Sequence, residues 1–226
     1  QNVVVLYGQR RIGKTSVLYQ LTLPEHVPAG FRPVYFDLQG RAEHRVSDSP
    51  PAPGGASPPR VDVLGVGVSA IRMADAVETC AAWIAARQRH YVCVVPAHSV
   101  MDCRADAALR EVVNRAGLVT PDGMALVWLL RLRGHRRTER VYGPDLMLAL
   151  CERSPERGWR HYFLGGEAGV AETLAARLAV RFPGLTVAGT LSPPFRALTD
   201  EEDAALCRSV NEARPDIVWV GLGSPK

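Results

Sequence analysis

The sequence contains few of the features that mark membrane-spanning, secreted or zinc-binding proteins. Its apolar runs are short and interrupted, so none of the 226 residues belongs to a segment that could cross a bilayer as a helix. No basic-then-apolar leader opens the sequence, which argues against secretion. The five cysteines are ten or more positions apart and form no Cys-x-x-Cys pair. We therefore expect buried, reduced thiols in a cytoplasmic protein, and neither a zinc knuckle nor a redox dithiol.

Lysine is almost absent. Among the 27 basic residues only Lys14 and Lys226 are lysines, and the formal net charge is +4. A charge of this size does not indicate nucleic-acid binding. Because arginine is a good bidentate ligand for phosphate, phosphorylated partners remain open.

A segment rich in proline, glycine and serine divides the sequence. Ten of the fifteen residues in 46–60, VSDSPPAPGGASPPR, are proline, glycine or serine, and the segment has no apolar periodicity. Such a segment cannot bury enough surface to offset its ordering entropy, so we interpret it as a flexible or polyproline-like tether. The sequence thus predicts a short piece over 1–45, too small for a complete core, and a domain of ordinary size over 61–226.

The second piece alternates between two apolar patterns. Short Val-rich runs closed by Gly or Pro predict buried parallel strands at 61–68, 91–95, 161–166, 185–190 and 216–223. Apolar residues at three- and four-residue spacing predict helices at 74–88, 99–115, 123–132, 145–156, 168–182 and 200–213. This alternation predicts an α/β fold with a Rossmann-like, open, mostly parallel sheet and helices on both faces. Ligands bind such sheets at the carboxyl ends of the strands.

The first piece contains a phosphate-loop pattern. Gly8, Gly13, Lys14 and Thr15 follow the spacing G-x-x-x-x-G-K-T, between a strand-like and a helix-like run. In such a loop, backbone N–H groups surround a phosphate, Lys14 would reach the β/γ oxygens of ATP, and Thr15 would hold magnesium. The segment resembles the start of a P-loop ATPase of the AAA type. The second magnesium ligand is missing before the linker, so we prefer an incomplete, non-functional fragment.

A second glycine pattern opens the larger piece. Gly65, Gly67 and Ala70 form G-x-G-x-x-A, which a dinucleotide-binding protein would follow with an acidic residue about 20 positions later. That region reads Arg87-Gln88-Arg89-His90. We therefore prefer a tight turn between a strand and a helix, and an NAD-dependent oxidoreductase is the weaker alternative.

Five stretches of the larger piece together resemble one known family. They are VDVLGVGVSAI (61–71), LVTPDGMALVWLLRLRG (118–134), ERVYGPDLM (139–147), HYFLGGEAGVAETLAARL (161–178) and DIVWVGLGSPK (216–226). In order and spacing they resemble the WecG/TagA/CpsF family, glycosyltransferase family 26. The resemblance implies inverting transfer of a hexose, N-acetylmannosamine or a related sugar, from a UDP-sugar donor. The implied acceptor is a polyprenyl-diphosphate-linked saccharide in teichoic acid, capsule or exopolysaccharide synthesis.

The same resemblance implies where such an enzyme works and with what. It implies a cytoplasmic enzyme that is peripheral at the inner face of the membrane and has no nucleic-acid partner. It leaves the oligomeric state open, a homo-oligomer included. The competing hypothesis from the first piece is a nucleotide-dependent regulatory module, in which ATP and magnesium occupy the phosphate loop and the second domain only binds.

Two residues are candidates for the acid–base chemistry. Inverting transfer needs a base that takes the proton of the acceptor hydroxyl. By resemblance, Asp122 in Pro-Asp-Gly has this role, although Asp before a helical run is also a typical N-cap, and both roles stay open. His98 stands in a turn where many members of the family carry Thr-Pro-Asn. We treat it as an auxiliary acid–base group or sugar contact, with a surface residue as the alternative.

The remaining candidates concern the diphosphate and the sugar. None of the eleven Asp residues is two positions from another, so the metal-binding Asp-x-Asp motif is missing, no metal is predicted, and arginine and helix N-termini would neutralise the diphosphate. Arg140 matches the conspicuous active-site arginine of the family, and its stretch contains two further candidates, Gly143 and Asp145. Strand ends contribute the others, for which a simple turn is the alternative: Gly165, Gly166, Gly221, Gly223 and Ser224.

Two regions differ from the family or extend its pattern. Past Lys226 the family continues through Gln-Glu into a basic helical region that contributes to membrane contact, so we expect the domain to be truncated relative to the family. The basic residues Arg131, Arg133, Arg136 and Arg137 predict a solvated surface that is useful near anionic lipid.

Overall fold

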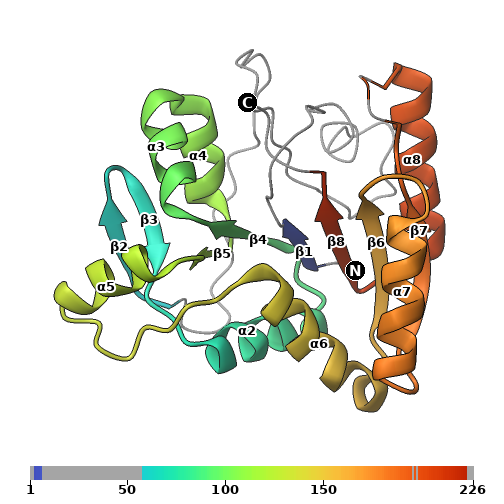
Figure 1. Cartoon of the computed structure of the whole chain (residues 1–226), viewed down its shortest axis with the longest axis horizontal. Helices are drawn as coiled ribbons and strands as arrows, with labels where there is room; N and C mark the ends of the chain where they lie inside the picture. Colours follow the sequence, from blue (N-terminus) through green and yellow to red (C-terminus); the bar gives the residue numbers. More distant parts are fainter. Residues whose placement is uncertain (1–2, 7–57, 195, 197, 223–226) are drawn as a thin grey trace.

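A computed structural model of the chain describes residues 3–6, 58–194, 196 and 198–222 (Figure 1). Its centre is a six-stranded sheet in the order β5-β4-β1-β8-β6-β7, in which every neighbouring pair is parallel. The strands are β1 Val3–Leu6, β4 His90–Val95, β5 Leu118–Pro121, β6 Arg160–Gly165, β7 Thr186–Leu191 and β8 Ile217–Gly221. The prediction of an α/β fold with an open parallel sheet is confirmed.

The helices follow the predicted pattern closely. They are α2 Met73–Ala85, α3 Ala97–Ala105, α4 Ala107–Arg115, α5 Met124–Leu132, α6 Gly143–Arg157, α7 Val170–Arg181 and α8 Asp200–Ala213. The single helix predicted over 99–115 is two helices, because Asp106 adopts an extended conformation and caps the second one. Its carboxylate accepts hydrogen bonds from the N–H groups of Ala108 and Leu109, which α4 itself cannot satisfy.

Helices cover both faces of the sheet, since successive side chains of a buried strand point to opposite sides. Along β4, Val92 and Val94 pack into the core cluster that includes α2, α6 and α7. The alternating residues Tyr91, Cys93 and Val95 pack into the cluster that includes α3, α4 and α5. Helix α8 packs against β6 and β8 through a third cluster. In Figure 1, α3 and α4 lie on one side of the sheet and α2 and α6 on the other.

The predicted strand over 61–68 is wrong. This stretch is an antiparallel hairpin of β2 Arg60–Val63 and β3 Val66–Ser69, outside the main sheet. The chain reverses at Leu64 and Gly65, whose φ angles are 55° and 89°. Positive φ at both central residues is the geometry of a type I′ turn, which matches the twist of paired antiparallel strands.

The hairpin is bonded to its neighbours through its backbone. Asn114 of α4 donates to the Gly65 carbonyl and accepts from the Gly67 N–H, both at 2.8 Å. The Ser69 hydroxyl accepts from the N–H of Val119 on the outer strand β5, at 3.1 Å. The predicted turn between a strand and a helix is therefore wrong. The glycine pattern forms a turn between two strands, and Asn114 is hydrogen-bonded to that turn. The backbone N–H that a dinucleotide phosphate would need at Gly67 is already bonded.

Strand β1 belongs to the centre of the main sheet. Residues Val3–Leu6 pair with β4 on one side and with β8 on the other. These four residues come from the piece that the sequence separates from the larger domain. The predicted boundaries at 1–45, 46–60 and 61–226 stay a prediction, because residues 7–57 lie outside the described residues.

Two expectations drawn from missing features concern the thiols and the membrane. All five cysteines are buried and free, as expected, and burial raises the pKa of the Cys80 thiol to about 12. Within the described part of the chain, no helix combines the length and the apolar character needed to span a bilayer.

Candidate active site

The carboxyl ends of the parallel strands meet at one edge of the sheet, where β4 ends at Val95, β5 at Pro121, β6 at Gly165 and β8 at Gly221. From β1 the strand order runs through β4 and β5 on one side, while β8, β6 and β7 fill the other side. Such a reversal of strand order leaves a crevice above the sheet, where ligands bind in open α/β folds.

Asp122 lies at this edge, directly after β5. Its backbone N–H donates to the carbonyl of Val95 at the end of β4, at 3.0 Å. Its side chain is only 11% exposed. The N-cap of α5 is Gly123, so the alternative interpretation of Asp122 as the N-cap is wrong.

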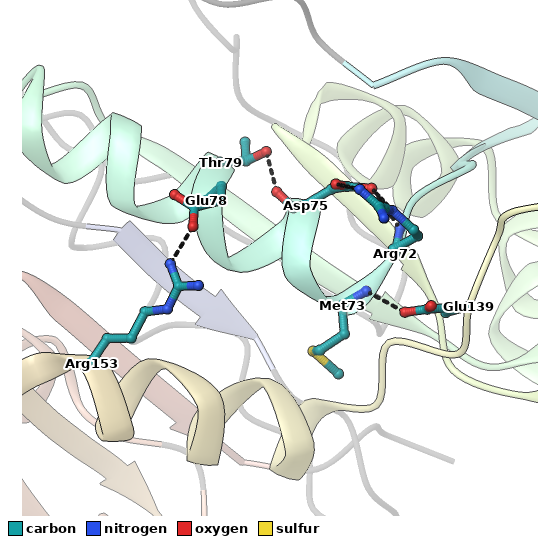
Figure 2. Close-up of polar contacts among 7 residues, drawn as sticks. All are labelled: Arg72, Met73, Asp75, Glu78, Thr79, Glu139 and Arg153. Carbon is teal, nitrogen blue, oxygen red and sulfur yellow. Dashed lines mark hydrogen bonds and ion pairs between the residues drawn. The ribbon is translucent and has the colours of Figure 1, made fainter.

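The segment that carries Arg140 is fixed by its flanking residues. The Val141 N–H donates to the Pro121 carbonyl at 3.0 Å, and the Glu139 N–H donates to the Ile71 carbonyl at 3.1 Å. Figure 2 shows the Glu139 carboxylate accepting from the Met73 N–H at the start of α2, at 3.1 Å. A carboxylate at this point satisfies one of the free N–H groups of the helix and complements its dipole. Backbone and side-chain bonds thus hold Arg140 beside the end of β5.

Arg140 and Asp122 form an ion pair. The Arg140 Nη2 donates to the Asp122 Oδ1 at 3.2 Å. The guanidinium carbon lies 4.3 Å from the centroid of the Tyr142 ring, a distance typical of a cation–π contact. The Arg140 side chain is 45% exposed, so its guanidinium also faces solvent and is accessible to an anionic ligand.

The surroundings of Asp122 act on its pKa in both directions. Burial raises the pKa of the carboxyl above its ordinary value, and the charge of Asp145 adds to this increase. The hydrogen bond and the charge of Arg140, together with the charge of His98, oppose it. Burial is the largest cause, and the net pKa is raised. A carboxylate with a raised pKa is a stronger base at neutral pH.

His98 and Asp145 complete the charged group around Asp122. His98 is an exposed residue in the first turn of α3, the helix that follows β4. Asp145 is exposed in the first turn of α6, after the buried Gly143 and the half-buried Pro144. The structure therefore brings Arg140, His98 and Asp145 within electrostatic range of Asp122.

The predicted glycines lie at the same edge on the other half of the sheet. Gly165 and Gly221 are register partners at the ends of β6 and β8, and the Gly166 N–H donates to the Gly221 carbonyl at 3.3 Å. A Cβ atom on Gly165 would lie 2.4 Å from the Gly221 oxygen, so close strand packing requires glycine there. With about 4.8 Å between neighbouring strands, β8 lies roughly 14 Å across the sheet from β5. These glycines accordingly do not contact Asp122.

Some predicted site residues lie outside the described residues: Gly8, Gly13, Lys14, Thr15, Gly223 and Ser224. Conversely, sequence reasoning missed Glu139 and Tyr142, which hold and flank Arg140. Their adjacency to Arg140 was the available signal. Among the residues that the structure describes, no three His, Cys, Asp or Glu side chains are grouped to hold a metal ion.

Comparison with known proteins gives the family of this chain. Residues 61–226 match the family described as the glycosyl transferase WecG/TagA/CpsF family. The chain belongs to this family. The match spans Asp122 and Arg140, and it begins at Val61, so the ATPase-like segment gains no support from it.

Three relatives carry the same name, N-acetylglucosaminyldiphosphoundecaprenol N-acetyl-beta-D-mannosaminyltransferase. The Bacillus spizizenii protein is 28% identical over 114 residues, which are 50% of this chain and 42% of the relative. The Bacillus subtilis protein is 23% identical over 51% of this chain and 43% of the relative. The Staphylococcus aureus protein is 24% identical over 74% of this chain and 65% of the relative. The chain thus spans between about two fifths and two thirds of these relatives' lengths.

Proposed function

We propose that the chain is an inverting glycosyltransferase that moves N-acetylmannosamine or a related hexose from a UDP-sugar to a polyprenyl-diphosphate-linked saccharide. Its family and the shared name of its relatives support this reaction. The observation that carries the proposal is the largely buried Asp122 carboxylate, paired with Arg140 at the carboxyl edge of the sheet. This edge combines a base and a cation, the two groups that the reaction needs.

Asp122 acts as the general base. Its carboxylate takes the proton of the acceptor hydroxyl while the hydroxyl oxygen bonds to the anomeric carbon of the donor sugar. The bond from that carbon to the diphosphate oxygen breaks, and its electron pair leaves with UDP. Burial raises the pKa of Asp122, which makes the carboxylate a better proton acceptor than a solvated one.

Arg140 neutralises the departing diphosphate. A guanidinium binds phosphate oxygens through charge-assisted bonds and can do so in place of a metal ion. Arg140 lowers the pKa of Asp122. If the Arg140 guanidinium moves from the Asp122 carboxylate to the diphosphate as the donor binds, the pKa of Asp122 rises and the carboxylate becomes more basic. We accordingly propose donor binding that does not depend on divalent metal. Asp145 is then a substrate contact at the same site, and His98 is an auxiliary acid–base group or a sugar contact.

The acceptor determines where this enzyme would work. The polyprenyl chain of the acceptor is embedded in a membrane and its charged diphosphate lies at the membrane surface. We therefore propose a cytoplasmic enzyme that acts at the inner membrane face. The competing hypothesis of a nucleotide-dependent regulatory module has no described residue in its favour.

The test is the substitution Asp122→Asn, assayed with UDP-N-acetylmannosamine and a polyprenyl-diphosphate-linked N-acetylglucosamine. The change retains the size of the side chain and removes the basic oxygen. We expect turnover to fall by roughly 10² to 10⁴, the usual contribution of a general base, with the affinity for UDP retained. Asp106→Asn is the matched control, because Asn caps α4 as well as Asp does.

A variant with near-full turnover would show that Asp122 is not the base, and His98 would be tested next. If the unchanged chain binds UDP and transfers the sugar only to a different lipid-linked acceptor, the donor class stands and the proposed acceptor is wrong.

A further inference from the structure

Helix α5, which begins directly after the Asp122–Gly123 pair, has apolar residues on two opposite sides. Leu126 and Leu130 are buried in the core cluster that contains residues of β4 and β5, and Val127 is also buried. Met124, Trp128 and Leu132 face solvent with exposed fractions of 41%, 60% and 85%. A surface helix of a soluble domain normally carries polar residues on its outer side.

The exposed residues form a continuous stripe. At 100° per residue, Met124, Trp128 and Leu132 fall within an arc of about 80°, roughly opposite the buried residues, and they extend about 12 Å along the helix. The exposed Ala125 lies beside them. Helix α5, MALVWLLRL, contains no acidic residue. We refer to Met124, Trp128 and Leu132 as the α5 stripe.

A collar of arginines follows the stripe at the end of the helix. Its exposed members are Arg131, Arg133, Arg136 and Arg137. Among the residues that the structure describes, none of these four guanidinium groups forms an ion pair. The one carboxylate in this segment, Glu139, is bonded to the N-terminus of α2.

The collar has a defined backbone conformation. Gly134, with φ of 98°, ends α5, and the His135 N–H donates to the Leu130 carbonyl at 3.1 Å. The Arg131 Nε donates to the Thr138 carbonyl at 2.9 Å, which closes the loop. The loop therefore presents Arg133, Arg136 and Arg137 next to the exposed Leu132.

We propose that the α5 stripe and its arginine collar dock the protein on an anionic phospholipid surface. The proposal rests on the proposed function, because Asp122 immediately precedes α5 and the acceptor would be held in that same lipid surface. Trp and aliphatic side chains insert at the boundary between headgroups and acyl chains, while arginines next to them bind anionic headgroups. Docking through α5 would bring Asp122, the proposed base, to the membrane surface, where the diphosphate of the lipid-linked acceptor lies.

The charge pattern favours lipid over a second copy of this chain. A two-fold symmetric contact through the α5 stripe would bring the same patch of both copies together. In a parallel pairing of the two helices the collars would face each other and repel, and in an antiparallel pairing each collar would face the Met124 end of the other α5, which contains no acidic residue to neutralise it. Anionic headgroups neutralise the collar.

Vesicle co-sedimentation of the full chain tests the proposal, with phosphatidylcholine vesicles that contain or lack phosphatidylglycerol. We expect binding to the anionic vesicles, weakened by added salt. Arg136→Gln/Arg137→Gln should lower the partition coefficient roughly tenfold or more, since each basic residue near such a surface contributes about fivefold. Trp128→Gln/Leu132→Gln should lower it by a similar factor, and both variants should retain their affinity for UDP.

Matched controls lie on other helices. Val180→Gln on α7 removes an apolar side chain that is 83% exposed, close to the 85% of Leu132. Arg177→Gln/Arg208→Gln removes two exposed arginines on other helices. Both should bind vesicles like the unchanged chain, as should Asp122→Asn, so the loss of transfer and the loss of docking are distinguishable. Equal binding by the stripe, collar and control variants would overturn the proposal. It would also be overturned if Trp128→Gln/Leu132→Gln dissociated an oligomer in light scattering and left vesicle binding unchanged.

Discussion

Charged neighbours act on the Asp122 carboxylate in opposite directions, which makes its role testable at the scale of single residues. Arg140 lowers its pKa and Asp145 raises it. A general base works only when deprotonated, so kcat/KM falls as the pH drops through that pKa. Arg140→Gln should therefore move the acid limb of the pH–rate profile to higher pH, and Asp145→Asn should move it to lower pH. Shifts of the same sign in both variants would contradict the assignment of Asp122 as the base.

His161, buried on β6, couples stability to pH. Its Nδ1 accepts from the Trp219 Nε1 at 2.9 Å, so the neutral ring carries its proton on Nε2, which lies 2.6 Å from the Ser154 hydroxyl. Burial lowers the pKa of His161 to about 4. The unfolded chain, with an ordinary histidine pKa of about 6.5, binds this proton more readily, so stability is lost as pH falls from about 6.5 to 4. The loss amounts to about 3 kcal/mol.

Urea unfolding of the unchanged chain and of His161→Gln, across this pH range, measures the effect. The variant should have a lower free energy of unfolding at pH 7 and a flatter pH dependence. An equally steep curve for the variant would assign the acid sensitivity to other groups.

At the scale of elements, the close approach of β6 and β8 depends on Gly165. Its φ is +127° and an added Cβ would lie 2.4 Å from the Gly221 carbonyl oxygen, so Gly165→Ala combines backbone strain with a steric clash. Gly158, with φ of +67° at the end of α6, has no atom within 4 Å of an added Cβ. Gly158→Ala should thus lower the free energy of unfolding by about 1 kcal/mol from strain alone, and Gly165→Ala by about 2 kcal/mol or more. Denaturant titration checks both values.

At the scale of the whole molecule, β1 connects the two halves of the sheet. Because β4 and β8 both pair with Val3–Leu6, removal of residues 1–7 would leave two strands with unpaired N–H and C=O groups. We expect such a chain to unfold on the order of 10 °C lower or to aggregate. Thermal unfolding and light scattering measure this, with Lys14→Ala as a control that changes the phosphate-loop motif and retains β1. Equal unfolding temperatures would mean that β1 is dispensable.

Much of the architecture could be predicted from local pattern. The three- and four-residue spacing of apolar side chains predicted helices such as α2 and α6, because a helix buries one side. The split between α3 and α4 was missed, since Asp106 interrupts the apolar spacing by a single residue. Asp122 and Arg140 were predicted individually from their motifs, whereas Glu139 and Tyr142, which hold and flank Arg140, have no distinctive spacing.

The sequence by itself determined the types of most elements, because these depend on residues that are close along the chain, and it determined the family, which is carried by motifs in a fixed order between 61 and 226. Only the tertiary structure decided that 61–68 is a hairpin, since Leu64 is a non-glycine residue with positive φ and carries no turn signal. It also decided that β1 lies between β4 and β8, and that Asp122 and Arg140, eighteen positions apart, form an ion pair. Strand order and contacts at a sheet edge depend on how distant segments pack, and no local pattern of side chains encodes that packing.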